Sequence, residues 1–382
     1  MTLKVCLLDT AIRGTIGSMH RYRDQLLRGF AEHSADLDVD VRCLGLSQDV
    51  FQATPARFRM WRHHLHVWRS AKRSDFSDFD VVHLLDGSFG YVASAVDQQS
   101  KTVCTVHDVI PRLQMDGRFP TAPRIGRGAG WLIGRCLKGL AKSHMIVAVS
   151  QSSASDLMRF GVRPALGVEV VWNALEPELF QVQRLVARTD RRGKSLDLPE
   201  RYLLHLGNNG FYKNRKGAYE IFRNMDEKLD MHLVLAGPPL DSVLRDEVVR
   251  AGLKDRVIEV VDPSEETVAS LYSRACVFVF PSLYEGFGWP PLEAMSVGCP
   301  VVSSNAGSLA EVVGSGGIVE ESGDYSAMGK ACERLIADQG FRDEVVGRGK
   351  RHVANFTLQK MSESMAAVYR KVADSHGNGV AR

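Results

Sequence analysis

The chain has 382 residues, a length that fits two domains of ordinary size better than one small core. With 45% hydrophobic and 24% charged residues, its composition excludes a disordered or fibrous protein. The net charge of +3 excludes a chain that binds polyanions along its whole length, and no apolar run approaches the ~20 residues needed to cross a membrane.

Short apolar runs separated by helical or loop-like spacers mark the first half of the chain. They predict buried parallel strands in the segments "LKVCLLD", "VDVRCLGL", "DVVHLLD", "KTVCTVHD" and "HMIVAVS". Residues 1–180 are therefore expected to form a doubly wound α/β domain. The charged stretch 181–199 interrupts the pattern and is the predicted linker.

The same strand pattern returns over residues 200–360, which predicts a second α/β domain. Its strands are expected in "RYLLHLGN", "MHLVLAG", "RVIEVV", "ACVFVFPS" and "PVVSSN". Open parallel sheets bind ligands at the carboxyl ends of their strands, so chemistry is expected in the loops that follow these runs.

The stretch "YEGFGWPPLEAM" follows one such strand, which is predicted to end near Pro281. A helix is predicted to begin about Pro290 and to stop before Gly298, since proline suits a first turn and glycine the position after a last one. The N-terminus of this helix would attract an anion such as a phosphate. Gly286 and Gly288 would let the backbone approach that anion closely.

Two glutamates flank this glycine loop, and each has its own interpretation. Glu293 falls in the first helical turn, where an acid commonly does no more than favour the helix dipole. Glu285 precedes the helix, where a carboxylate is best used to accept hydrogen bonds from ligand hydroxyls.

The segment "EGFGWPPLE", with glutamates at both ends, resembles the EX7E signature of retaining glycosyltransferases of family 4, also called group 1. The resemblance is nearly continuous over residues 281–328 and weaker over most of the chain. It implies the GT-B fold, with two Rossmann-like doubly wound α/β domains facing across a cleft. It also implies that residues 361–382 form a helix crossing back to the first domain, followed by a mobile tail.

The resemblance assigns roles to individual residues of the second domain. Glu285 would contact hydroxyls of the transferred sugar, and Glu293 the ribose of the nucleotide. The amides of Phe287 and Gly288 would approach the diphosphate or the sugar. Backbone around Val261 would lie against the nucleotide base, which leaves the identity of the base open.

A basic pair that stabilises the departing diphosphate is expected in "LHLGNNGFYKNRKG". Lys213 matches the lysine of this pair, but Asn208 stands where the family has an arginine. We hypothesise that Arg215 compensates. Preorganised cations or N–H groups could stabilise the developing negative charge without a metal ion.

Two further positions of the resemblance lie in the first domain. His107 in "TVHDVIPR" matches a histidine that lines the sugar-binding cleft, whereas His83 is interpreted as structural. Gly17 matches the first glycine of a "GGxxRY" loop and would let the acceptor or a phosphate approach. The alternative there is an ordinary helix cap by Ser18, which replaces the second glycine.

The implied reaction is a metal-independent transfer of a hexose from a nucleotide sugar, with retention of configuration, and no cofactor is expected. GDP-mannose is the first choice of donor, with a UDP-sugar as the alternative. The acceptor would be a hydroxyl of a glycan or a lipid-linked saccharide in cell-surface polysaccharide biosynthesis. Three rival functions stay open: a sugar-nucleotide epimerase of the same fold, a glycosidase using both glutamates, and a non-catalytic protein that binds a sugar or a membrane surface.

Two segments, 56–73 and 124–144, combine basic with apolar residues. In the first, Phe58, Trp61, Leu65 and Trp68 recur at helical spacing. Such a helix can lie on an anionic membrane or pack on its own core. No nucleic-acid motif accompanies these charges, so no nucleic-acid partner is expected. Scattered cysteines and the absence of a secretory signal predict a cytoplasmic protein, peripheral on the inner face of the cell membrane if the basic segments bind it.

Overall fold

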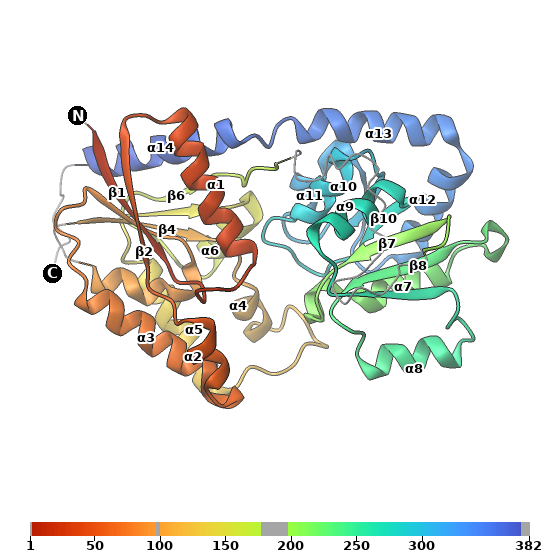
Figure 1. Ribbon diagram of the computed structural model, residues 1–382, viewed down its shortest axis with the longest axis horizontal. Helices are drawn as coiled ribbons and strands as arrows, with labels where there is room; N and C mark the ends of the chain where they lie inside the picture. The colour runs from red at the N-terminus through yellow and green to blue at the C-terminus, as the bar shows by residue number, and fades with distance from the viewer. Residues whose placement is uncertain (1, 97–99, 177–197, 376–382) are drawn as a thin grey trace. The chain divides into compact units, whose positions relative to one another are not determined.

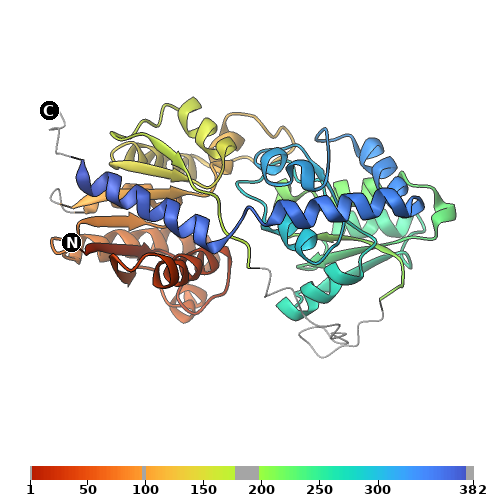
Figure 2. The same cartoon turned by 90° about the horizontal axis from the view of Figure 1, so that it is seen from above.

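A computed structural model describes residues 2–96, 100–176 and 198–375 (Figures 1 and 2). The described chain separates into two compact units. Unit 1 comprises the residues up to Ala174 together with those from Thr357 onward, and unit 2 comprises Leu175–Phe356. The predicted linker 181–199 lies outside the described residues, except for its last two positions, and so do residues 376–382 of the predicted tail.

Unit 1 is built on a parallel sheet that, among the described residues, has six strands in the order β2-β1-β3-β4-β5-β6. The strands are β1 (Leu3–Asp9), β2 (Leu37–Cys43), β3 (Val81–Leu84), β4 (Lys101–Val106), β5 (Met145–Ala148) and β6 (Val168–Val170). The interior strands β3 and β5 are buried along their whole length, because helices cover both faces of a parallel sheet.

The helices of unit 1 connect successive strands. They are α1 (Ser18–His33), α2 (Gln48–Ala53), α3 (Arg59–Arg73), α4 (Ile110–Met115), α5 (Arg127–Leu140) and α6 (Gln151–Arg159), with short 3-10 segments η1 (Ala56–Phe58) and η2 (Gly87–Ala95).

Helix α3 buries a different face from the predicted apolar stripe. The residues it packs inward are His63, Val67 and Ala71, whereas the stripe residues Trp61 and Trp68 are exposed. Of the two alternatives for this stripe, packing on the core is therefore wrong.

Helix α14 (Leu358–Asp374) returns the chain to unit 1, where it lies beside α1 (Figures 1 and 2). Gly29 of α1 allows the close approach, since a Cβ there would lie 2.8 Å from Ser362 Cβ. Tyr369 of α14 is fully buried and shares a hydrogen bond with Nδ1 of His83, 2.6 Å away. Nε2 of His83 meets Oγ1 of Thr105 at 2.7 Å, so His83 holds α14 onto the sheet, in agreement with its structural interpretation.

Unit 2 repeats the architecture with the strand order β12-β11-β10-β7-β8-β9 in its described residues. All of its pairings are parallel, and the prediction of α/β domains is confirmed in both units. The strands are β7 (Tyr202–Leu206), β8 (His232–Gly237), β9 (Val257–Val261), β10 (Val277–Phe280), β11 (Val301–Ser304) and β12 (Ile318–Glu320).

Helices cover both faces of this second sheet. They are α7 (Arg215–Arg223), α8 (Ser242–Arg250), α9 (Glu265–Arg274), α10 (Trp289–Ser296), α11 (Leu309–Val312), α12 (Tyr325–Ala337) and α13 (Gln339–Val353), with 3-10 segments at η4 (Phe211–Lys213), η5 (Glu227–Leu229) and η6 (Gly314–Gly316). None of the described helices has the length and apolar character required to cross a membrane.

Strand β7 is flanked by β8, the next strand in the chain, and by β10, the third one after it. The chain passes from β7 to β8 and β9 on one side of β7 and then continues with β10 on the other side. The carboxyl ends of β7 and β10 therefore border a topological switch point. Ligands of doubly wound sheets bind at such points.

Candidate functional site

Lys213 and Glu285 meet at this switch point. Lys213 ends η4, in the loop after β7, and Glu285 lies in the loop after β10. The Nζ of Lys213 donates to both carboxylate oxygens of Glu285, at 2.9 Å each. Both side chains are largely buried, with 17% and 8% exposed, so the ion pair is shielded from solvent. Ser282 Oγ donates a further hydrogen bond of 2.7 Å to Glu285 Oε1.

The backbone of Glu285 is fixed from the chain that follows β11. Ser308 donates to the carbonyl of Glu285 through both its N–H, at 3.0 Å, and its Oγ, at 3.1 Å. Gly307 has a φ of +61°, and a Cβ there would lie 2.4 Å from the carbonyl oxygen of Glu285. Only glycine fits this position, which explains the tight anchoring of the Glu285 loop.

The glycine loop ends at the N-terminus of α10, as predicted. Gly288 is the N-cap residue with a φ of +106°, and Pro290 and Pro291 follow in the first turn. The side chain of Phe287 is buried against Phe356, with ring centroids 5.9 Å apart. The positive end of the α10 dipole is favourable for an anion, although Pro290 and Pro291 contribute no N–H groups to this turn.

Glu293 lies one turn inside α10 and is buried, so its predicted position in the first helical turn is wrong. The hydroxyl of Tyr272, on α9, donates to Glu293 Oε2 at 3.0 Å. This partner comes from a different helix, and the sequence offered no signal for the pairing.

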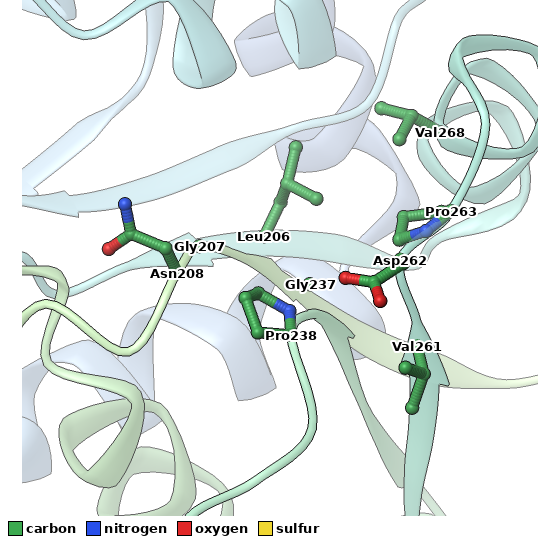
Figure 3. A pocket seen from close by; sticks show the side chains of 9 residues that line it. All are labelled: Leu206, Gly207, Asn208, Gly237, Pro238, Val261, Asp262, Pro263 and Val268. Carbon is green, nitrogen blue, oxygen red and sulfur yellow. The ribbon is translucent and has the colours of Figure 1, made fainter. Parts of the chain in front are cut away.

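A cavity of about 550 Å³ lies at the carboxyl ends of β7, β8 and β9 (Figure 3). Its walls include Asn208 after β7, Pro238 after β8, Val261 and Asp262 at the end of β9, and Val268 of α9. Asp262 has a φ of +45°, a strained conformation for a residue other than glycine. The volume is in the range of small-molecule sites, and Val261, predicted to lie against the nucleotide base, is one of the lining residues.

Arg215 is not among the residues that line this cavity. It starts α7 and is buried, with Nη1 donating to Asn209 Oδ1 and to the carbonyl of Pro238, both at 2.7 Å. Its Nε and Nη2 groups meet no acceptor in the part of the chain that the structure describes. Burial lowers the pKa of Arg215, and the neighbouring Glu259 opposes the shift. Arg215 thus ties the ends of β7 and β8 together and retains unused donors.

His205, in β7, was not predicted as a site residue. Its Nδ1 donates to the carbonyl of Val279 at 3.1 Å, and its Nε2 has no hydrogen-bond partner among the described residues. Burial lowers the pKa of His205 to about 3, so the ring is neutral at ordinary pH. A Cβ on Gly207 would lie 3.1 Å from Nε2, so the ring packs against Gly207, where the loop that carries Lys213 begins. Its place near a strand end was the only sequence signal.

In unit 1, His107 follows β4 and is held in one orientation. Its Nε2 donates to the carbonyl of Leu85 at 3.0 Å, and its ring meets the edge of Tyr22, with centroids 4.7 Å apart. Burial lowers the pKa of His107, while the nearby Asp86 raises it. The ring is therefore neutral, and since Nε2 carries the proton, Nδ1 is left as an acceptor.

Gly17 is the N-cap residue of α1, and no side chain caps this helix. The alternative of a cap by Ser18 is therefore wrong. The φ of Gly17 is 173°, an extended conformation open to any residue, and nothing lies within 4 Å of its Cβ position. Backbone strain does not require glycine here, but the position leaves space for a ligand to approach.

Two family models match the chain. Residues 20–179 match the model described as "Glycosyltransferase Family 4", and residues 186–352 match "Glycosyl transferases group 1". The Escherichia coli protein named O-antigen chain mannosyltransferase B is 30% identical over 239 residues, which cover 61% of this chain and 62% of that protein. The E. coli serotype-specific mannosyltransferase WbdA is 27% identical over 341 residues, 84% of this chain and 41% of that protein. The matched regions thus span less than two thirds of these relatives.

Among solved structures, the Anabaena protein HepE in complex with UDP-glucose superposes with a TM-score of 0.71. The match covers 97% of this chain and 100% of that chain, at 16% sequence identity. At this identity the likeness establishes the fold, which is that of the GT-B glycosyltransferases.

Proposed function

Because the chain belongs to the group 1 glycosyltransferases of family 4, we propose that it transfers a hexose from a nucleotide sugar to a hydroxyl acceptor. The transfer is proposed to retain the configuration of the sugar and to need no metal ion. The observation that carries this proposal is the Lys213–Glu285 pair at the switch point of unit 2. In this pair, Lys213 would supply a cation for the leaving phosphate, and Glu285 would supply a carboxylate for the sugar hydroxyls. The cavity of about 550 Å³ at the same edge of the sheet would hold the nucleotide.

The proposed donor runs along the carboxyl edge of the unit 2 sheet. Its base would occupy the cavity beside Val261, where backbone contacts predominate. Its ribose would bind Glu293, and its diphosphate would lie between Lys213 and the N–H groups of Phe287 and Gly288. Its sugar would then reach Glu285. The support for this order is that the named residues lie at or after the carboxyl ends of β9, β7 and β10 in one sheet, in which β8 separates β9 from β7.

The proposed chemistry uses no protein nucleophile. The bond from the anomeric carbon to the diphosphate oxygen breaks, and the acceptor hydroxyl forms its bond on the same face. The leaving phosphate oxygen takes the hydroxyl proton. Lys213 and the loop amides stabilise the negative charge that develops, which preorganised donors do best in a buried site. Glu285 positions the sugar, and both of its carboxylate oxygens accept hydrogen bonds from Lys213.

Asn208 replaces the expected arginine by a neutral amide at the cavity wall. Its Oδ1 accepts from the N–H of Gly210 at 2.8 Å, which leaves the amide nitrogen as a donor for the diphosphate. Arg215 is proposed to add positive charge from beneath the loop, and its Nε and Nη2 groups are the donors available for this.

Mannose is the proposed sugar, because the E. coli relatives are named mannosyltransferases, and GDP-mannose is then the first donor to test. A UDP-sugar is the second, because HepE binds UDP-glucose. In unit 1, the neutral His107 is proposed to accept a hydrogen bond from a hydroxyl of the bound substrates. The acceptor is proposed to be a glycan or a lipid-linked saccharide of a cell-surface polysaccharide.

The proposal is tested by thermal shift with GDP, UDP, GDP-mannose and UDP-glucose, followed by transfer assays with the donor that binds. A ligand that binds only the folded state at 100 times its Kd stabilises it by about 2.7 kcal/mol. We expect one nucleotide series to raise the melting temperature and the transferred sugar to keep its anomeric configuration. The same assay in excess chelator should give full activity.

Four outcomes would overturn parts of this proposal. An inverted product would exclude the retaining mechanism, and loss of activity in chelator would exclude metal independence. Release of an epimerised sugar from the donor alone would show an epimerase, and binding without turnover on any acceptor would show a non-catalytic protein.

A further inference from the structure

Unit 1 contains a cavity of about 590 Å³ that the proposed donor site does not use. Its walls come from α3, the start of η2, the end of β4, and helices α4 and α5. Apolar side chains make most of the lining, among them Val109, Leu132, Ile133, Leu137 and Leu140. The volume is in the range of sites that bind small molecules.

Two tryptophans from distant parts of the sequence meet at this cavity. Trp61 of α3 lines it, and its ring stacks on that of Trp131 of α5, with centroids 6.4 Å apart and planes at 22°. Gly128 allows this contact, since a Cβ there would lie 3.2 Å from the Trp61 ring. The tryptophans are 47% and 59% exposed, so a large apolar surface stays in water next to the cavity. Such surfaces mark binding sites for apolar ligands.

The interior of the cavity carries no buried cation. His64 lines the cavity, and its Nδ1 shares a hydrogen bond of 2.9 Å with the hydroxyl of Tyr91. Its ring stacks on Phe89, with centroids 4.5 Å apart. Burial lowers the pKa of His64 to about 4, which keeps the ring neutral at physiological pH. The inner walls thus favour an uncharged, apolar group.

Positive charge is confined to the side of the cavity formed by α4 and the segment before α5. Arg112 and Arg124 both line the cavity there. Arg124 is exposed and makes no ion pair with a carboxylate of the described ranges, and Arg112 has only Asp116 at 3.8 Å. Neither α3 nor α5 contains an acidic residue, and Asp108 is the one carboxylate in the described lining. Helix α4 begins three positions after His107.

We propose that this cavity binds the apolar chain of the acceptor, with a phosphate group of the same molecule at Arg112 and Arg124. Apolar walls next to two arginines, of which Arg124 makes no ion pair with a described carboxylate, are complementary to a molecule that joins an aliphatic chain to an anionic head. The phosphate would then lie at the end of the cavity lined by Asp108 and Arg112, which follow His107 closely in the sequence. This assignment of substrate class rests on the proposed transferase function, but the binding itself does not require turnover.

The experiment measures binding of decyl phosphate to the full chain by calorimetry, below the concentration at which the probe forms micelles. Decanol supplies the alkyl chain alone, and glycerol phosphate supplies the phosphate head alone. We expect decyl phosphate to bind at one site per protein molecule, at least tenfold more tightly than decanol or glycerol phosphate. Binding to anionic phosphatidylglycerol vesicles is measured as well, because adsorption of the protein to a charged surface would not depend on the cavity.

Variants locate the site. Ile133→Trp, which fills the cavity, should weaken decyl phosphate binding at least tenfold. Arg124→Glu should do the same but leave decanol binding unchanged. The matched control is Arg127→Glu, because Arg127 is also exposed and lies three positions from Arg124 but does not line the cavity. Its effect should stay below twofold.

Equal binding of decyl phosphate by Ile133→Trp and the wild type, or equal weakening by the two arginine changes, would overturn the proposal and leave surface adsorption. The thermal shift produced by nucleoside diphosphates is recorded for every variant. If that shift is normal while decyl phosphate fails to bind, only the acceptor assignment is lost. If the nucleotide shift is absent in the wild type, the proposed donor function fails instead.

Discussion

The Nζ of Lys213 lies 2.9 Å from both carboxylate oxygens of Glu285, although the two residues stand 72 positions apart in the sequence. The pair joins the loops that follow β7 and β10, the two strands that border the switch point of unit 2. A cation and an acceptor are thus held together at the edge of the sheet where a ligand is expected.

Glu285→Gln tests the proposed hydrogen bonds from the sugar hydroxyls to Glu285, because the substitution keeps the shape of the side chain and removes its charge. We expect turnover to fall at least a hundredfold, which is about 2.7 kcal/mol of transition-state stabilisation. The free energy of unfolding should fall by about 1–3 kcal/mol, because the buried Lys213 loses its charged partner. Steady-state kinetics and urea denaturation measure the two effects.

The matched control for this change is Glu344→Gln. Glu344 lies on α13 with its side chain 63% exposed, and its pairing with Arg348 is long, at 3.9 Å. Neither turnover nor stability should change measurably there. Transfer by Glu285→Gln at a rate near that of the wild type would remove Glu285 from the proposed mechanism.

Gly307→Ala tests whether the conformation of the Glu285 loop depends on the chain after β11. The new Cβ would approach the carbonyl oxygen of Glu285 to 2.4 Å, at a φ of +61°. We expect a loss of about 3 kcal/mol in the free energy of unfolding, from strain and overpacking together. Donor affinity should fall with it, as measured by urea denaturation and by calorimetry.

Gly323→Ala provides the comparison for backbone strain alone. Gly323 also has a positive φ, +94°, but nothing lies within 4 Å of its Cβ position. It should cost only the ~1–2 kcal/mol of the left-handed conformation and leave donor affinity intact. Equal effects at the two glycines would show that contact with Glu285 is unimportant.

Arg215→Met tests whether this arginine replaces the one expected at position 208. If its charge acts on the diphosphate, the affinity for a nucleoside diphosphate should fall at least tenfold while the affinity for the uncharged nucleoside stays unchanged. Calorimetry with both ligands separates these effects. An equal loss for the two ligands would mean that Arg215 only ties together the ends of β7 and β8 through Asn209 and Pro238.

Buried neutral histidines make stability depend on pH. Burial lowers the pKa to about 3 for His83 and His205 and to about 4 for His64. In the unfolded chain these groups take up protons below a pKa of about 6.5, whereas the folded protein does not. The free energy of unfolding should therefore be highest above pH 6.5 and fall as the pH drops toward 4. Each such histidine contributes up to ~1.4 kcal/mol per pH unit to this fall.

His83→Gln isolates one of these contributions. Urea denaturation at pH 7.5, 6.5 and 5.5 should show a shallower decline for the variant than for the wild type, by roughly the binding of one proton. Carboxylates titrate alike in both proteins and cancel in the comparison. Parallel curves for the two proteins would mean that His83 takes up a proton without unfolding the chain.

Much of the fold could be predicted from the sequence, because its signals are local. Runs of buried apolar residues bounded by turns predicted ten of the twelve described strands, and only the three-residue edge strands β6 and β12 were missed. The helix expected from about Pro290 to before Gly298 is α10, Trp289–Ser296. Proline in a first turn and glycine after a last one act within a few residues, so the local sequence suffices. The glycine loop with Glu285 and Glu293 was identified for the same reason.

The tertiary structure alone decided which side chains meet. Lys213 pairs with Glu285, and Tyr272 with Glu293, because β7 lies beside β10 and α9 packs near α10, and no local pattern encodes such neighbours. It also decided that α3 buries His63, Val67 and Ala71 and leaves Trp61 to stack on Trp131. Helical periodicity shows that a helix has two faces, but only the elements packed against it determine which face is buried.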